Sequence, residues 1–319
     1  MNAPVARGLL AGALLLCLTG CSAGLLRKAA AAQPRLEIDQ VPYFPQRDHQ
    51  CGPAALATIL TAAGASTSAD ALTHEVYIAG RKGSLQAELL AAARRHERVA
   101  FVLEPTLPAL LQELEQARPV LVLQNFGFES WPRWHYAVVV GYDRERDSFL
   151  LRSGRHQRQQ LAARRFLATW RRAGNWGFVA LRPGELPAVA NPASFLNAVA
   201  ALETLGSRDS ASLAYQAAVS RWPEEPLAWF ALGNNRLALG EDAAAEAAYR
   251  EVLRIAPAQL PARNNLALLL ARRGCVAAAR AALEPARVAA GNGAFAAQIA
   301  DSFHEIEARG IADAACSMH

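Results

Sequence analysis

The C-terminal half of this 319-residue chain repeats itself at an interval of 34 residues. At that shift the sequence aligns glycines, alanines, tyrosines and prolines: Gly206, Gly240 and Gly274; Ala211, Ala245 and Ala279; Tyr215 and Tyr249; Pro223 and Pro257. A fixed period of this length indicates helical hairpins that stack on their own copies, because one unit cannot bury its apolar face alone. We therefore expect three units over residues 192–291, followed by a capping helix and tail over 292–319.

In the middle unit, Trp229-x-x-Leu232-Gly233 is followed by Gly240, Tyr249 and Pro257. Small residues let two antiparallel helices approach, Tyr249 fills the groove between them, and Pro257 ends the second helix because it has no N–H to donate. This unit closely resembles the tetratricopeptide repeat, which implies an all-α solenoid that binds peptides or a protein partner. A generic alanine-rich helical bundle is the alternative.

The first residues have the pattern of an export signal. Arg7 precedes the apolar run Leu9–Leu18, which is too short to span a hydrocarbon layer of roughly 30 Å and indicates a cleaved signal. The residues Leu18-Thr19-Gly20-Cys21 resemble a bacterial lipobox. The resemblance implies a signal peptide over 1–20, lipidation of Cys21, a linker over 21–36 and, with Ser22 after the cysteine, an outer-membrane lipoprotein facing the periplasm. An ordinary secretory signal is the alternative.

The cysteines that follow Cys21 are three in number: Cys51, Cys275 and Cys316. An odd number in an oxidising compartment leaves one thiol free. Cys275 and Cys316 both lie in the C-terminal half, so we expect them to form a disulfide and Cys51 to stay reduced. Loss of Arg7 with the signal lowers the formal charge from +5 to +4, and the arginines are dispersed, so no nucleic-acid partner is expected.

Residues 37–185 mix helical and strand patterns, and a linker over 186–191 leads to the repeats. We expect helices at 51–63, 84–96 and 107–117, and strands at 119–125, 135–142, 148–153 and 176–181. The polar residues 143–147 make the second and third of these strands a hairpin. A helix packed on an antiparallel sheet is an α+β arrangement.

The reactive chemistry centres on Cys51, in the run Gln46-Arg47-Asp48-His49-Gln50-Cys51-Gly52-Pro53. A cysteine in the first turn of a buried helix meets unpaired N–H groups and the positive end of the helix dipole, which favour the thiolate. A thiolate nucleophile needs a general base from elsewhere in the chain. His135, at the head of a strand, is the best candidate, because the other histidines lie on peripheral or polar segments; His49 is the alternative.

Gln46-x(4)-Cys51-Gly52-Pro53-Ala54-Ala55, followed by Trp134-His135-Tyr136-Ala137, resembles the C39-like peptidases, a papain-like family. The resemblance implies an α+β papain-like cysteine peptidase domain before the tetratricopeptide solenoid. It also implies Cys51 as nucleophile, His135 as base and Gln46 as oxyanion donor. The family places that glutamine six residues before the cysteine, whereas Gln46 lies five before it, and Gln50 is the substitute.

The family's aspartate, which orients the histidine, is missing from this sequence. Asp143 and Asp147 sit at the hairpin tip, eight or more residues from His135, or about 26 Å at 3.3 Å per residue. Folding the hairpin brings Ser153 or Gly154 opposite His135, so Ser153 is the expected equivalent, and Asn125 is the alternative. Loss of the carboxylate weakens the orientation of the base.

The sequence thus predicts an envelope-anchored cysteine peptidase whose repeats hold substrate or a partner. A catalytically inactive binding module and a papain-like amidase or transferase are the alternatives. No phosphate-binding loop, metal site or cofactor motif is present in the sequence. Trp131, Trp134 and Trp170 are expected either in the core or in a substrate cleft, and Arg152 and Arg155 either in solvent or on a substrate carboxylate.

Overall fold

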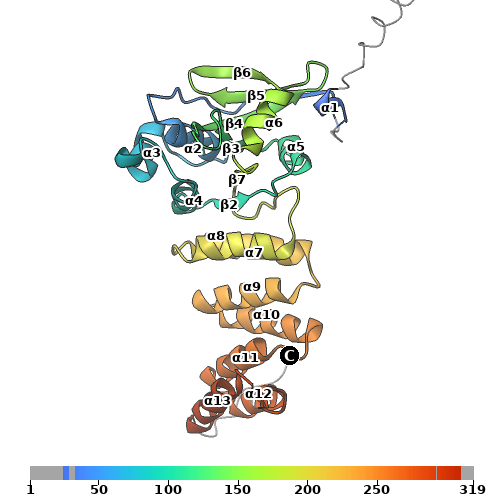
Figure 1. Ribbon diagram of the computed structural model, residues 1–319. Coiled ribbons are helices and arrows are strands. Elements are labelled where there is room, and N and C mark those ends of the chain that lie inside the picture. The colour runs from blue at the N-terminus through green and yellow to red at the C-terminus, as the bar shows by residue number, and fades with distance from the viewer. Residues whose placement is uncertain (1–23, 29–32, 292, 310–319) are drawn as a thin grey trace, which may run out of the picture.

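The computed structural model describes residues 24–28, 33–291 and 293–309. The proposed signal peptide, Cys21 and Cys316 lie outside these residues. The described chain has two parts, an α+β domain and a column of helices that extends away from it (Figure 1).

The α+β domain is built on one seven-stranded sheet whose neighbouring strands are all antiparallel. The order is β2-β7-β3-β4-β5-β6, and β1 pairs with part of β4. The strands are β1 (Arg35–Glu37), β2 (Val99–Val102), β3 (Val120–Asn125), β4 (Trp134–Asp143), β5 (Ser148–Ser153), β6 (His156–Ala162) and β7 (Gly177–Leu181).

Helices cover both faces of this sheet, and each face has its own core. Helices α2 (Cys51–Ala62), α3 (Ala69–Val76) and α4 (Gln86–Arg95) share a core with Val138 and Val140 of β4. On the other face, α5 (Leu107–Glu115) and α6 (Ala163–Arg171) share a core with Ala137 and Val139. Because successive residues of a strand point to opposite faces, a strand covered on both sides is apolar throughout, as β4 is.

The repeats form three helical hairpins and a final helix, stacked below the sheet in Figure 1. The helices are α7 (Pro192–Glu203), α8 (Arg208–Arg221), α9 (Pro226–Ala238), α10 (Asp242–Ile255), α11 (Leu260–Arg272), α12 (Val276–Ala290) and α13 (Ala296–Ala308). Gly206, Gly240 and Gly274 have positive φ at the turns inside each hairpin, a conformation that glycine adopts without strain. The predicted tetratricopeptide solenoid is confirmed.

Gly233 and Tyr249 show why the middle unit needs these residues. Tyr249 is fully buried, and a Cβ on Gly233 would lie 2.7 Å from its ring. The glycine therefore makes room for the tyrosine in the groove between α9 and α10, as the sequence predicts.

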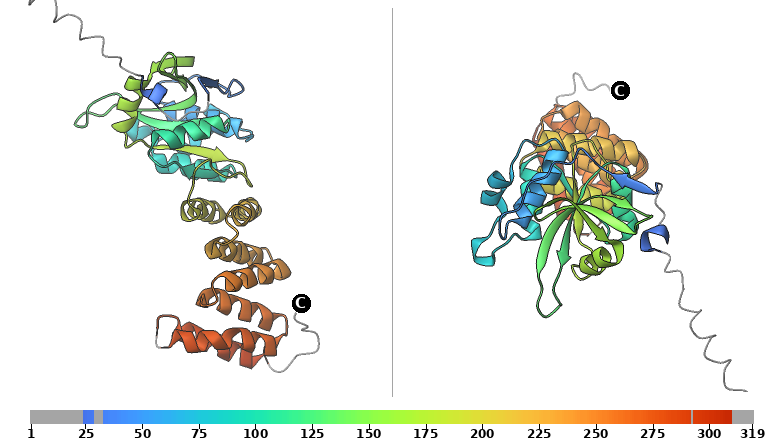
Figure 2. Two further views of the ribbon diagram at one scale, coloured as in Figure 1. Left: turned by 90° about the vertical axis from the view of Figure 1, so that its right-hand side faces the viewer. Right: turned by 90° about the horizontal axis from the view of Figure 1, so that it is seen from above.

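The two parts share one apolar core instead of meeting across a free joint. Phe195 of α7 lies 6.4 Å from Phe101 of β2 between ring centroids. In the preceding segment, the N–H of Ala188 donates to the buried carboxylate of Glu113 at 2.7 Å, and the same carboxylate accepts from Arg118. The connection is thus fixed to the α+β domain, and the left view in Figure 2 shows the helices extending away from it.

A short helix, α1 (Leu25–Lys28), docks on the β4–β5 hairpin within the segment expected to be a linker. Leu26 is fully buried, and its N–H donates to Asp147 at 2.8 Å. Arg144 donates to the carbonyl of Leu26 at 3.1 Å, and a Cβ on Gly24 would lie 2.8 Å from the Asp147 carboxyl carbon. The start of the described chain is therefore held at the hairpin tip.

No helix in the described residues is both long enough and apolar enough to cross a membrane. Cys275, which precedes α12, is disulfide-bonded. Its pairing with Cys316 stays a prediction, because Cys316 lies outside the described residues.

Candidate active site

Cys51 is the first residue of α2. Gln50 caps this helix without a side-chain hydrogen bond, so the first-turn N–H groups are not covered by a cap. A Cβ on Gly52 would lie 2.5 Å from the hydroxyl of Ser84, so a larger residue after the cysteine would have to displace the Ser84 side chain. The thiol is free, as predicted from the cysteine count.

The Cys51 thiol lies against the backbone of β4. Burial raises its pKa, and hydrogen bonds from the backbone N–H groups of Tyr136, Gly52 and Cys51 itself oppose that rise. The pKa of Tyr136 is raised by burial and by the negative charge that Cys51 carries as a thiolate. Because Tyr136 follows His135 in the chain, β4 brings the predicted base next to the residue that contacts the predicted nucleophile.

The imidazole of His135 is held by Ser153. Nε2 of His135 lies 2.9 Å from the Ser153 hydroxyl, which can donate or accept and so suits either tautomer. The Phe126 ring lies 5.2 Å away between ring centroids. Burial lowers the pKa of His135 from 6.5 to about 4.

Ser153 reaches His135 across a displaced register. The ladder between β4 and β5 shifts at a bulge between Val139 and Gly141, and it then pairs Val138 with Arg152. Ser153 therefore lies diagonally across from His135, not directly opposite as the hairpin model predicted. Diagonal neighbours on one face of a sheet are still within side-chain reach.

The remaining acidic and amide candidates do not reach the histidine. Oδ1 of Asn125 accepts from the N–H groups of Gly127 and Arg133 at 2.8 and 2.9 Å, so this side chain closes the β3–β4 loop. Asp143 accepts from the N–H of Arg146 at the far end of β4, and Asp147 binds α1. These contacts engage Asn125 in the loop, whereas the contact of the His135 ring is with Ser153, and they are consistent with the exclusion of both aspartates.

Gln46 lies on the approach to Cys51. Its Nε2 donates to the carbonyl of Tyr136 at 3.5 Å, so the amide sits beside the same strand residue that contacts the thiol. Gln46 and Gln50 both line a pocket of about 290 Å³ in front of α2. Both glutamines therefore face one pocket at the start of α2, and Gln46 is also bonded to β4 through Tyr136.

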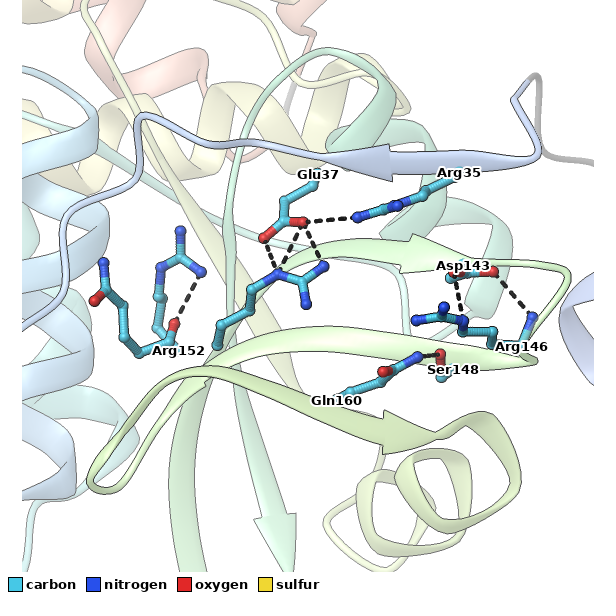
Figure 3. A network of polar contacts seen from close by, with 9 residues as sticks. Arg35, Glu37, Asp143, Arg146, Ser148, Arg152 and Gln160 are labelled. Carbon is cyan, nitrogen blue, oxygen red and sulfur yellow. Dashed lines mark hydrogen bonds and ion pairs between the residues drawn. The ribbon is translucent and has the colours of Figure 1, made fainter.

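A buried arginine and the β5–β6 turn fix the chain that leads to Gln46. Arg152, labelled in Figure 3, is 6% exposed. It donates to the carbonyls of Val41 at 3.3 Å and Gln157 at 2.8 Å. Gly154 accepts from the hydroxyl of Tyr43 at 3.0 Å and from the N–H of Gln46 at 3.2 Å. Arg152 therefore lies neither in solvent nor on a substrate, which corrects the expectation from sequence.

Ion pairs on the same side of the sheet tie β1 to β6. Glu37 accepts from Arg158 at 2.7 Å and lies 3.6 Å from Arg35, while Ser148 of β5 accepts from Gln160 of β6 (Figure 3). These contacts keep β5 and β6, and with them Ser153, in place against the chain that precedes α2.

The other histidines of the domain lie elsewhere. His49 is exposed in the loop before Cys51, His74 and His156 are exposed, and His96 lies 3.0 Å from the Glu75 carboxylate. The tryptophans divide: Trp170 is 1% exposed and belongs to the core, whereas Trp131 and Trp134 are exposed. Among the described residues, no group of three or more His, Cys, Asp or Glu side chains is placed to hold a metal ion.

No curated protein matches the chain. The TPR2B domain of yeast Sti1, solved as a complex with pHsp70, is 19% identical, covering 35% of this chain and 92% of that one with a TM-score of 0.34. The type III secretion translocator chaperone SycD of Yersinia enterocolitica is 17% identical, covering 37% and 83% with a TM-score of 0.35.

A protein described as a C39-like peptidase from Bacillus anthracis is 16% identical, covering 46% of this chain and 97% of that one with a TM-score of 0.38. Residues 38–178 match the model of the Peptidase_C39 like family, and they include Cys51, His135 and Ser153. The chain therefore joins a domain similar to the C39-like peptidases, with their papain-like fold, to a tetratricopeptide-type solenoid.

Proposed function

We propose that this chain is a cysteine peptidase that hydrolyses peptide bonds with Cys51 as nucleophile and His135 as base. The observation that carries the proposal is the convergence at the head of β4. Tyr136 contacts the thiol through its N–H, and the preceding His135 is bonded to Ser153. A nucleophile, a base and a group that orients the base are the three parts that such a mechanism needs.

The proposed reaction begins when Nε2–H of His135 donates to Ser153, which leaves Nδ1 to take the thiol proton. The thiolate attacks the peptide carbonyl carbon, and the Cys51 N–H and the Gln46 amide donate to the oxyanion. The imidazolium then gives its proton to the leaving amine, and the C–N bond breaks to leave a thioester on Cys51. Water, deprotonated by His135, hydrolyses the thioester and restores the thiol.

The test is hydrolysis of a peptide library by the purified protein and by its Cys51→Ala and His135→Ala variants. Both variants should be inactive while their circular dichroism stays that of the parent. Alkylation by iodoacetamide at pH 7 should modify Cys51 in the parent. Hydrolysis that survives in the Cys51→Ala protein would exclude this mechanism.

A second candidate, a binding module on a peptidase fold, is favoured by the electrostatics of the site. The pKa of Cys51 is raised and that of His135 is lowered to about 4, both because of burial, so the resting pair is neutral. No carboxylate stands at Ser153 to stabilise an imidazolium. Absence of turnover together with slow alkylation of Cys51 would support this candidate over the first.

We also propose that a lipid on Cys21 anchors the protein in the outer membrane, facing the periplasm, and that the repeats bind a protein partner or the substrate. The lipobox-like residues support the first part, and the docking of α1 on the hairpin explains how a short tether holds the domain. Cys21→Ser should abolish incorporation of labelled fatty acid and release the protein from the membrane fraction. Persistence in that fraction would contradict the anchor.

A further inference from the structure

The aromatic loop, defined as residues 126–134, comprises the connection between β3 and β4 and the first residue of β4, and it carries four of the five exposed phenylalanine and tryptophan side chains of the described residues. Phe126, Phe128, Trp131 and Trp134 are 40%, 78%, 78% and 54% exposed. Among the described residues, the one other exposed phenylalanine or tryptophan is Phe295, at 39%. Single exposed apolar side chains are common on protein surfaces. Several exposed rings gathered in one place are uncommon and indicate a binding surface.

Hydrogen bonds fix the conformation of the aromatic loop. Asn125 accepts from the N–H groups of Gly127 and Arg133, and Phe128 and Trp131 exchange backbone hydrogen bonds of 3.2 and 3.3 Å. A Cβ on Gly127 would lie 2.2 Å from the Trp131 carbonyl oxygen, so the backbone is closed tightly there. A preorganised loop binds a ligand with little loss of conformational entropy.

The aromatic loop stands on the His135 side of the proposed site. At the start of the loop, the Phe126 ring lies 5.2 Å from the imidazole between ring centroids. In the proposed reaction His135 protonates the leaving amine, so the substrate residues that depart with that amine lie next to the imidazole. Those residues follow the scissile bond, and the aromatic loop is the exposed surface beside them.

A lipid bilayer is the competing occupant, and the position of α1 argues against it. Gly24 packs on Asp147 at the hairpin tip, and Cys21 is three residues earlier in the chain. His135 and Asp143 are eight residues apart on β4, or about 26 Å at 3.3 Å per residue. An anchor on Cys21 thus holds the opposite end of β4 toward the membrane and leaves the aromatic loop in water.

We propose that the aromatic loop binds an apolar or aromatic side chain of the peptide substrate immediately after the scissile bond, with Trp131 and Trp134 determining this specificity. The inference rests on the proposed peptidase function and adds a substrate class to it. The contact is made by rings that stack on or enclose the substrate side chain, without any charged partner.

The experiment compares cleavage of a peptide library, varied at the two positions after the scissile bond, by the parent, by a Trp131→Ala/Trp134→Ala variant and by Phe295→Ala. The parent should prefer aromatic and large aliphatic residues. The double variant should lose about tenfold to a hundredfold in kcat/KM for those peptides, mostly through KM, and little for peptides with small residues. Phe295→Ala, an exposed ring on the repeats, should match the parent.

The rate at which iodoacetamide alkylates Cys51 is the readout that separates recognition from damage to the site, and it should be the same in all three proteins. Equal selectivity of the double variant and the parent would overturn the inference and leave the peptidase proposal standing. So would binding of the Cys21→Ser protein to phosphatidylcholine vesicles that disappears in the double variant. If no peptide is cut by the parent, the proposed function fails and the inference falls with it.

Discussion

Nε2 of His135 and the hydroxyl of Ser153 are 2.9 Å apart, on neighbouring strands of one sheet. Ser153 is 6% exposed, so the hydroxyl is held in a nearly dry position. A hydroxyl can fix the direction of the imidazole, but it carries no charge to stabilise an imidazolium. Ser153 can therefore orient the imidazole as a triad carboxylate does, but it cannot stabilise the imidazolium by charge.

Replacement of Ser153 by aspartate should raise the rate. A carboxylate at this position would accept from Nε2–H and favour the charged imidazole, whose pKa is now depressed by burial. We expect an increase of about tenfold in hydrolysis and in alkylation of Cys51 at pH 7, because removal of the carboxylate from a serine-protease triad costs about 10⁴-fold. The measurement is the rate constant for each reaction in parent and variant.

Ser153→Asn is the matched control, since it offers a neutral acceptor of nearly the same size as aspartate. It should not exceed the parent. Equal rates for the asparagine and aspartate variants would show that charge at this position does not limit the reaction.

Burial of His135 should make the stability of the domain fall in acid. Between pH 6.5 and pH 4, the imidazole binds a proton in the unfolded chain, where its pKa is 6.5, but stays neutral in the folded domain, where its pKa is about 4. The stabilisation is therefore complete above pH 6.5 and is lost as the pH falls toward 4, by up to about 3 kcal/mol. Urea unfolding at pH 7 and pH 4.5 measures the difference.

Between pH 7 and pH 4.5, the free energy of unfolding of His135→Gln should fall by about 2 to 3 kcal/mol less than that of the parent. His156→Gln, on the exposed face of β6, should leave the fall unchanged. An identical loss in all three proteins would mean that His135 is not buried in its neutral form.

Gly233→Ala should destabilise the repeats. The added Cβ would lie 2.7 Å from the Tyr249 ring, which is buried and donates to Asn234 at 2.8 Å, so ring and helix must move apart. Overpacking of this kind costs about 1 to 3 kcal/mol, visible as a lower Tm. Gly80→Ala, where a Cβ meets nothing within 4 Å, is the control, and Tyr249→Leu should restore part of the loss in Gly233→Ala.

The 34-residue repeat, the apolar runs and the turn residues made much of the fold predictable. Every helix and strand expected in the α+β domain is present, because apolar runs and turn residues mark elements that are buried on one or both faces. The elements missed include α1, α3, β2, β6 and α6. β6 is a mostly exposed edge strand of polar residues, and β2 has four residues, so neither carries a periodic apolar signal.

The parts of the site that depend on local chemistry or on hairpin geometry were predictable. Cys51, His135 and Ser153 each follow from a helix start, a strand head or a folded hairpin. The bulge at Val139 and Gly141, and the burial of Arg152 against Val41, depend on contacts between residues far apart in sequence. Patterns within one segment carry no information on such contacts.

Leu26→Ala should release α1 from the hairpin. Leu26 is fully buried in the core shared by β4 and α6, and loss of such a side chain removes about 2 to 5 kcal/mol of docking free energy. We expect the amide of Leu26, which donates to Asp147, to exchange with solvent at least about thirtyfold faster. Trypsin should also cut after Arg27 more readily. Hydrogen exchange followed by mass spectrometry measures the first effect.

Leu25→Ala is the control, because Leu25 is 44% exposed on the same short helix. Its exchange should match the parent, since the hydrogen bonds from Leu26 to Asp147 and from Arg144 to Leu26 remain. Equal exchange in both variants would contradict docking of α1. Docking matters for the proposed anchor because a lipid three residues before Gly24 then fixes which end of β4 faces the membrane, whereas a released segment would let the domain turn freely.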